Sequence, residues 1–95
     1  MLESISINQL KDIKDALIID IRNLEKYNDN HILNALNIPF EQLIINYSKY
    51  LNKEKKYYIY CQRGIKSRKI CLMLKQLGYN VININGGYEA WILNQ

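Results

Sequence analysis

The stretch from Tyr57 to Leu77 constrains the fold most, because an apolar run, a short basic loop and a helical pattern follow one another directly. The run Tyr58-Ile59-Tyr60 is aromatic and β-branched, which predicts a buried strand ending at Cys61. A loop over 62–66 follows, and a helical pattern begins at Ser67. Four residues share one face of this helix: Ile70, Cys71, Leu74 and Leu77.

The position of Cys61 predicts a reactive thiolate. A cysteine between the end of a strand and the start of a helix faces unpaired backbone N–H groups and the positive end of the helix dipole. Arg63, Lys66 and Arg68 add positive charge, and Gly64 permits a turn that aims N–H groups into one concavity. A free cysteine has a pKa of about 8.5, and such surroundings lower it. Cys61 is therefore a candidate nucleophile; the simpler alternative is that it only fills the end of a strand.

Other segments alternate between strand and helix patterns. An apolar run over 16–20 predicts a central strand buried on both faces. Alternating strands and helices predict an α/β fold with helices on both faces of the sheet and ligands at the carboxyl ends of the strands. The remaining expected elements are a strand at Ile5, a two-turn helix capped by Ser6 and Gln9, a short helix over 24–27, a turn over 28–30, an edge strand over 37–39, a helix over 40–51, a strand over 80–84 and a helix over 88–92.

Several segments together resemble the rhodanese family. Residues 61–67, Cys-Gln-Arg-Gly-Ile-Lys-Ser, are similar to the rhodanese active-site loop, usually Cys-x-x-Gly-x-(Arg/Lys)-Ser. Three further family signatures follow the expected order: Ile19-Asp20-Ile21-Arg22, residues 31–39 from His31 to Pro39, and residues 85–91 from Asn85 to Trp91. The resemblance covers nearly the whole chain and implies a rhodanese-like fold with a central parallel sheet.

The resemblance also implies an activity. Cys61 would accept sulfane sulfur from thiosulfate or a persulfide donor, hold it as a persulfide, and pass it to a thiol, a protein cysteine or cyanide. The residues implied in substrate binding are Gln62, Arg63, Gly64, Ile65, Lys66 and Ser67. Asp20 and Arg22 are implied to support the loop; alternatively, they only pair with each other or cap backbone groups.

The single histidine is a tempting general base, since Cys–His pairs commonly activate a sulfur nucleophile. The resemblance instead implies a structural role for His31. The chain departs from the family at Asn30 and Asn34, where glycine is usual. Asparagine tolerates left-handed backbone conformations best among non-glycine residues, so the same turns remain feasible.

Composition and cysteine count set further bounds. The 95 residues (1–95) correspond to a single domain, and 48% hydrophobic with 23% charged residues is ordinary for a globular protein. The net charge of +4 favours a small anionic substrate or acidic partner over nucleic acid, since no nucleic-acid-binding motif is present. Two cysteines ten positions apart favour neither a disulfide framework nor a metal site, and no cofactor is expected. Without a signal peptide or membrane-spanning run, a cytoplasmic location is expected.

Two other functions compete with sulfur transfer. Some phosphatases share the rhodanese fold, but their loop places an arginine six positions after the cysteine, where this chain has Ser67. Its cation, Lys66, comes one position earlier and lacks the bidentate fork that suits a phosphoryl group. The second rival is a non-catalytic binding module of the same fold. Such modules commonly lose the cysteine or the basic loop residues, and this chain keeps both.

Overall fold

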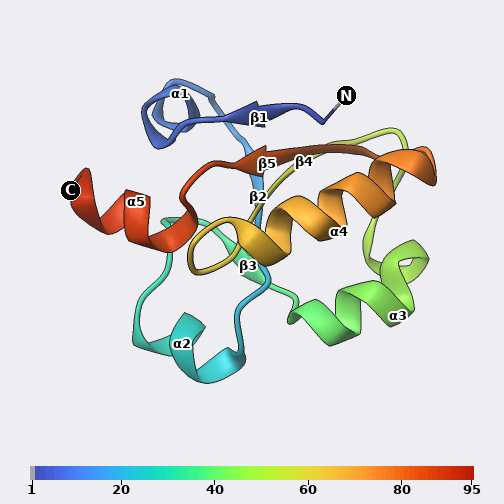
Figure 1. Ribbon diagram of the computed structural model, residues 1–95, viewed down its shortest axis with the longest axis horizontal. Coiled ribbons are helices and arrows are strands. Elements are labelled where there is room, and N and C mark those ends of the chain that lie inside the picture. Colours follow the sequence, from blue (N-terminus) through green and yellow to red (C-terminus); the bar gives the residue numbers. More distant parts are fainter. Residues whose placement is uncertain (1) are drawn as a thin grey trace.

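The computed structural model describes residues 2–95 as a five-stranded sheet with helices on both faces (Figure 1). The strand order is β1-β5-β4-β2-β3, and all neighbouring strands are parallel, which confirms the predicted fold class. None of the helices in this part of the chain is long and apolar enough to cross a bilayer. In chain order the elements are β1 (Ser4–Ile5), α1 (Ile7–Lys11), β2 (Leu17–Asp20), α2 (Leu24–Asp29), β3 (Leu36–Asn37), α3 (Phe40–Tyr50), β4 (Lys56–Tyr60), α4 (Ile65–Gln76), β5 (Asn80–Ile84) and α5 (Gly87–Leu93).

The central strands are buried on both faces, and alternate side chains enter two separate cores. Along β4, Tyr57 and Ile59 enter the core beneath α3 and α4, and Cys61 just after the strand joins them. Tyr58 and Tyr60 enter the core on the opposite face, with residues of α1, α5 and the segment after α2. Figure 1 shows α1 and α4 on opposite sides of β5. The side chain of Cys61 therefore lies on the α4 face.

The parallel register brings the carboxyl ends of three strands to one edge of the sheet. Asp20 at the end of β2 is aligned with Tyr60 at the end of β4, and Ile59 is aligned with Asn83 of β5. The segments that follow β2, β4 and β5 consequently meet around Cys61. This is the edge at which open α/β sheets bind their ligands.

Local sequence signals account for several boundaries. Ser6 and Gln9 form the predicted capping box of α1. Gly78 adopts a φ of 95° just after α4, as expected for a residue that ends a helix. Asn34 is left-handed with a φ of 69°, which glycine usually provides, whereas Asn30 is extended and needs no such tolerance. Pro39 precedes α3 and follows the edge strand β3.

Three predicted boundaries are wrong. Helix α4 begins at Ile65, two residues earlier than predicted, because Gly64 has a φ of 94° and turns the chain directly into the helix. Helix α1 has only five residues, since the backbone N–H of Asp12 donates to the Gln9 carbonyl and that of Ile13 to the Leu10 carbonyl, which tightens its end. Helix α2 continues to Asp29, through most of the predicted turn.

One predicted core position is also wrong. Leu77 was expected on the buried face of the helix after Cys61, but it is the C-cap residue of α4 and is 40% exposed. The other three members of that face, Ile70, Cys71 and Leu74, are buried as predicted. The reason is that the helical spacing ends with the helix, one residue before Leu77.

The start of α5 is in direct contact with the Cys61 loop. The backbone N–H of Tyr88 donates to the carbonyl of Cys61 at 2.9 Å, and that of Glu89 donates to the carbonyl of Gln62 at 3.0 Å. A Cβ added to Gly87 would lie 2.3 Å from the Cys61 carbonyl oxygen. The backbone at Gly87 thus approaches the Cys61 loop closely, and only glycine fits at position 87.

Gly87→Ala should destabilise the fold more than Gly78→Ala. Both glycines have positive φ, so each alanine costs about 1–2 kcal/mol of unfolding free energy from backbone strain. At Gly78 the added Cβ meets only the flexible end of Lys53, whereas at Gly87 it meets backbone, which adds roughly 1–3 kcal/mol. Urea unfolding of both variants measures the difference. Equal losses would show that the contact with the Cys61 loop is not tight.

Candidate active site

The Cys61 sulfur lies in a ring of backbone donors formed by its own loop. The N–H of Gly64 points to Sγ at 3.1 Å and that of Ser67 at 3.3 Å. The N–H of Arg63 also contributes a hydrogen bond to the sulfur. The predicted concavity is present because Gly64 reverses the chain and α4 then presents its unpaired first-turn N–H groups.

The pKa of the Cys61 thiol lies below its ordinary value. Burial raises the pKa, but hydrogen bonds from the Ser67 side chain and from the backbone of Ser67, Gly64 and Arg63 together outweigh it. These bonds, rather than the side-chain charges stressed by the sequence pattern, are the main cause of the shift. Arg68 is exposed on α4 and does not line the site, so its expected contribution is not found.

Ser67 connects the sulfur to the last strand. Its hydroxyl oxygen lies 3.4 Å from Cys61 Sγ and 2.6 Å from Asn83 Oδ1. Its one proton is donated to Asn83 while Cys61 is a thiol, and it can turn to the sulfur once Cys61 is ionised. Both Ser67 and Asn83 are almost fully buried. Asn83 therefore holds the hydroxyl next to the sulfur, a contact that was not predicted from the sequence.

The pKa of the second cysteine, Cys71, is shifted in the opposite direction. Cys71 is fully buried in α4, and burial raises its pKa to about 12, with a smaller contribution from the Cys61 charge. Among residues 2–95, no hydrogen bond compensates its lost hydration. The structure thus separates a thiol with a lowered pKa from a thiol with a raised pKa.

Asp20 and Arg22 form a buried ion pair that also contacts the loop. Arg22 Nη2 and Asp20 Oδ2 are 2.8 Å apart, and Tyr60 donates its hydroxyl to the same oxygen at 2.6 Å. Burial lowers the pKa of Arg22, but the hydrogen bond and the negative charge of Asp20 outweigh burial, so the pKa lies above its ordinary value. Arg22 Nη1 donates to Gln62 Oε1 at 3.4 Å. The two residues pair with each other and, through Arg22, contact the loop.

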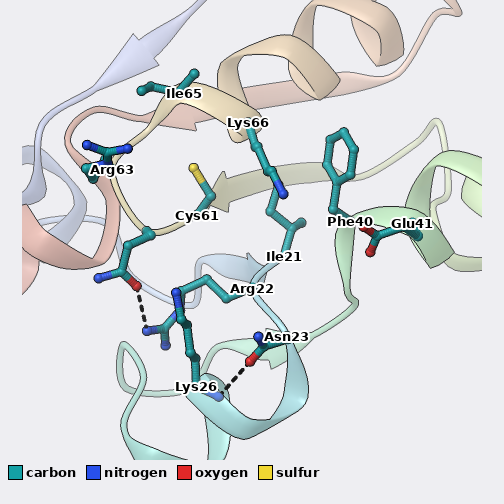
Figure 2. Close-up of a pocket in the computed structure, with 11 residues that line it drawn as sticks. Ile21, Arg22, Asn23, Lys26, Phe40, Glu41, Cys61, Arg63, Ile65 and Lys66 are labelled. Carbon is teal, nitrogen blue, oxygen red and sulfur yellow. Dashed lines mark hydrogen bonds between the residues drawn. The ribbon is translucent and has the colours of Figure 1, made fainter.

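A cavity of about 460 Å³ opens in front of Cys61 (Figure 2). The charged side chains in its lining are mostly basic. They are Arg22, Lys26, Arg63 and Lys66, with Glu41 as the single carboxylate. Lys66 lies above the ring of Phe40, with Nζ 5.4 Å from the ring centre. The rest of the lining consists of Ile21, Asn23, Phe40, Cys61, Gln62 and Ile65.

Each predicted loop residue is near the sulfur, but not all in the expected way. The backbone of Arg63, Gly64 and Ser67 bonds the sulfur, whereas Gln62, Ile65 and Lys66 contribute to the cavity wall. Within residues 2–95, no group of His, Cys, Asp and Glu side chains could hold a metal ion.

His31 does not take part in this site. Its ring stacks on Tyr27 with 3.8 Å between ring centres, and Nδ1 lies 2.8 Å from the Tyr27 carbonyl oxygen. It is not among the residues lining the Cys61 cavity. The histidine packs within the segment that follows β2, as the resemblance implied.

Sequence reasoning missed six residues of the site, of which Ile21 and Asn23 directly flank the predicted Arg22. Asn83 could have been found from the alternation of the strand. It lies two residues after the core residue Val81, so it faces the same core, where a polar side chain is unusual. No local signal marks the other three, since they reach the cavity from elements distant in sequence. These are Lys26 of α2 and Phe40 and Glu41 of α3.

Ser67→Ala should raise the pKa of Cys61, because the side-chain hydrogen bond is lost while burial remains. The pH at which Cys61 labelling is half-maximal should therefore move upward. The pH dependence of iodoacetamide labelling, with peptide mapping, measures this, and Cys71 should label only as the pH approaches about 12. Ser48→Ala, at an exposed serine of α3, is the matched control. An unshifted Cys61 profile in Ser67→Ala would contradict the role of the hydroxyl.

The sequence is similar to proteins named as sulfurtransferases. The chain is 35% identical over 79 residues to the thiosulfate sulfurtransferase GlpE of Coxiella burnetii, covering 82% of this chain and 73% of that protein. It is 37% identical over 90 residues to a sulfurtransferase of Allochromatium vinosum, covering 94% of this chain and 82% of that protein.

The fold is similar to solved structures of rhodanese-related proteins. A rhodanese-related protein from Thermoplasma volcanium superposes with a TM-score of 0.89 at 32% identity, covering 97% of this chain and 92% of that one. A rhodanese-like domain protein from Staphylococcus aureus superposes with a TM-score of 0.85 at 33% identity, covering 95% of this chain and 91% of that one. The family model of the rhodanese-like domain matches residues 6–94. The chain therefore belongs to the rhodanese-like domain family, whose sulfurtransferases are among its relatives.

Proposed function

We propose that the protein is a sulfurtransferase that carries sulfane sulfur from thiosulfate or a persulfide donor to a thiol-type acceptor as a Cys61 persulfide. The observation that carries the proposal is the position of Cys61 Sγ, which is hydrogen-bonded by its own loop and faces a basic cavity. Relatives named as thiosulfate sulfurtransferases support the same chemistry.

In the first half-reaction the Cys61 thiolate attacks the sulfane sulfur of thiosulfate. A bond forms between Sγ and the sulfane sulfur, and the bond from that sulfur to the sulfonate sulfur breaks. Sulfite leaves with the bonding electron pair, so the total charge of −3 on thiolate and thiosulfate is kept in the persulfide and sulfite. No proton is transferred, so this half-reaction needs no general base.

The loop is well suited to the anions of this step. Backbone N–H groups are fixed before the reaction, so they stabilise a thiolate or persulfide without reorganising. Lys66 lies at the position that matches the family's cation and would attract the dianionic donor. Arg63 also lines the cavity, but it does not match the position of the family's cation, so its contribution is expected to be smaller.

The two rival functions are less consistent with the site. Phosphoryl transfer would need an arginine at position 67, where a buried serine bonds Asn83 instead. A non-catalytic binding module would not need a cysteine whose pKa is lowered by several hydrogen bonds. A thiolate that must be regenerated in each cycle also suits the reducing environment of the cytoplasm.

Cys61→Ser should abolish sulfur transfer without unfolding the protein, because a serine alkoxide is hard to form and cannot carry a persulfide. The wild-type protein should gain the mass of one sulfur atom after exposure to thiosulfate, and Cys61→Ser should not. Intact-mass spectrometry and turnover with thiosulfate and cyanide measure both. Cys71→Ser is the matched control and should retain transfer. Persulfide formation in Cys61→Ser would overturn the mechanism.

Lys66→Ala should raise KM for thiosulfate, and added salt should reproduce part of the loss in the wild type by screening the same charge. The effect should be about fivefold or less, because Lys66 is exposed. Lys66→Arg should be milder because it keeps the charge. Steady-state kinetics over a range of ionic strength tests this, and an unaltered KM and salt dependence in Lys66→Ala would rule out the assigned role.

A further inference from the structure

Lys26 adds an unexpected positive charge to the active-site cavity. It lines the cavity from α2, whereas Arg63 and Lys66 come from the segment that follows Cys61. Within residues 2–95, no carboxylate lies within salt-bridge distance of Lys26, while the charge of Arg22 is compensated by Asp20. Lys26 is therefore available to bind an anionic group of a ligand.

Lys26 and Lys66 reach the cavity from different directions. Figure 2 shows the Lys26 side chain extending from α2 toward the guanidinium of Arg22, while Lys66 lies near Phe40 of α3. Glu41, the only carboxylate of the lining, belongs to α3 and follows Phe40 directly. The charge of Lys26 thus favours an anionic group of a ligand on the α2 side of the cavity, away from the reacting sulfur. The charge of Glu41 disfavours such a group on the α3 side.

The cavity is larger than thiosulfate requires. A volume of about 460 Å³ corresponds to roughly 15 water molecules in the liquid, whereas thiosulfate has only five heavy atoms. The charge of thiosulfate also lies on oxygens one bond from its sulfane sulfur, and Lys66 and the loop N–H groups suffice for it. The remaining space and the Lys26 charge suit a longer sulfur compound with its charge further from the sulfur.

We propose that Lys26 is a specificity-determining residue for the sulfur acceptor, and that it selects small thiols that carry a carboxylate. This inference rests on the proposed function and concerns the second half-reaction. The acceptor sulfur attacks the outer sulfur of the Cys61 persulfide, forming a new S–S bond, and the bond between Sγ and the outer sulfur breaks. The acceptor becomes a persulfide, its proton moves to the outer sulfur, and Cys61 is released as the thiolate.

Three acceptors of similar length test the proposal: 3-mercaptopropionate is anionic, 2-mercaptoethanol is neutral and cysteamine is cationic. The measured quantity is the ratio of kcat/KM for 3-mercaptopropionate to that for cysteamine, with thiosulfate as donor. Because intrinsic thiol reactivity cancels when this ratio is compared between variants, a merely structural effect of a mutation does not change it. Lys26→Gln should lower the ratio about fivefold, and Lys26→Glu should lower it further.

Lys49→Gln is the matched control, since Lys49 is an exposed helical lysine of α3 that does not line the cavity. It changes the net charge equally and should leave the ratio unchanged. An unchanged ratio in both Lys26 variants, with the wild type active, would overturn the role of Lys26 while leaving the proposed function intact. If the wild type forms no persulfide and transfers no sulfur to any of the three thiols, the proposed function itself fails.

Discussion

The contact between the start of α5 and the Cys61 loop is the constraint on which the site depends. The carbonyls of Cys61 and Gln62 accept hydrogen bonds from the N–H groups of Tyr88 and Glu89, which fixes the orientation of these two peptide groups. Further along the chain, the N–H groups of Gly64 and Ser67 donate to Sγ. Gly87 permits this approach because a side chain at that position would occupy the space of the loop backbone. The last element of the chain thus orients the loop in its middle.

The two cysteines show how local hydrogen bonding decides reactivity where burial alone does not. Both thiols are buried on the same face of the sheet, and burial raises the pKa of each. Only Cys61 meets donors that compensate for its lost hydration, because it lies at the end of a strand, before the helix has paired its N–H groups. Cys71 lies within the same helix, where all neighbouring N–H groups are already used. Position relative to the helix start therefore separates the thiol with a lowered pKa from the thiol with a raised pKa.

The sequence predicted the parts of the structure that depend on local patterns. The strand before Cys61, the capping box at Ser6 and the αβ alternation follow from periodicity and capping chemistry, and the structure confirms them. The start of α4 was placed two residues late because the conformation of Gly64 depends on its contact with α5, which no local pattern encodes. Lys26 was missed for a similar reason. Its helix could be located near the site, but the face that it turns to the cavity is set by tertiary packing.

The basic residues around Cys61 divide into those that hold the structure and those that remain available for a ligand. Arg22 is buried, and its guanidinium is bound by Asp20, the Asn30 carbonyl and Gln62, so its charge is compensated before any substrate arrives. Removing either partner of such a pair leaves an uncompensated buried charge, which is strongly destabilising. Lys26 and Lys66 are exposed and form no ion pair among residues 2–95. Charge that is compensated within the fold thus belongs to the cavity wall, whereas the charge of the two lysines stays available for an anionic ligand.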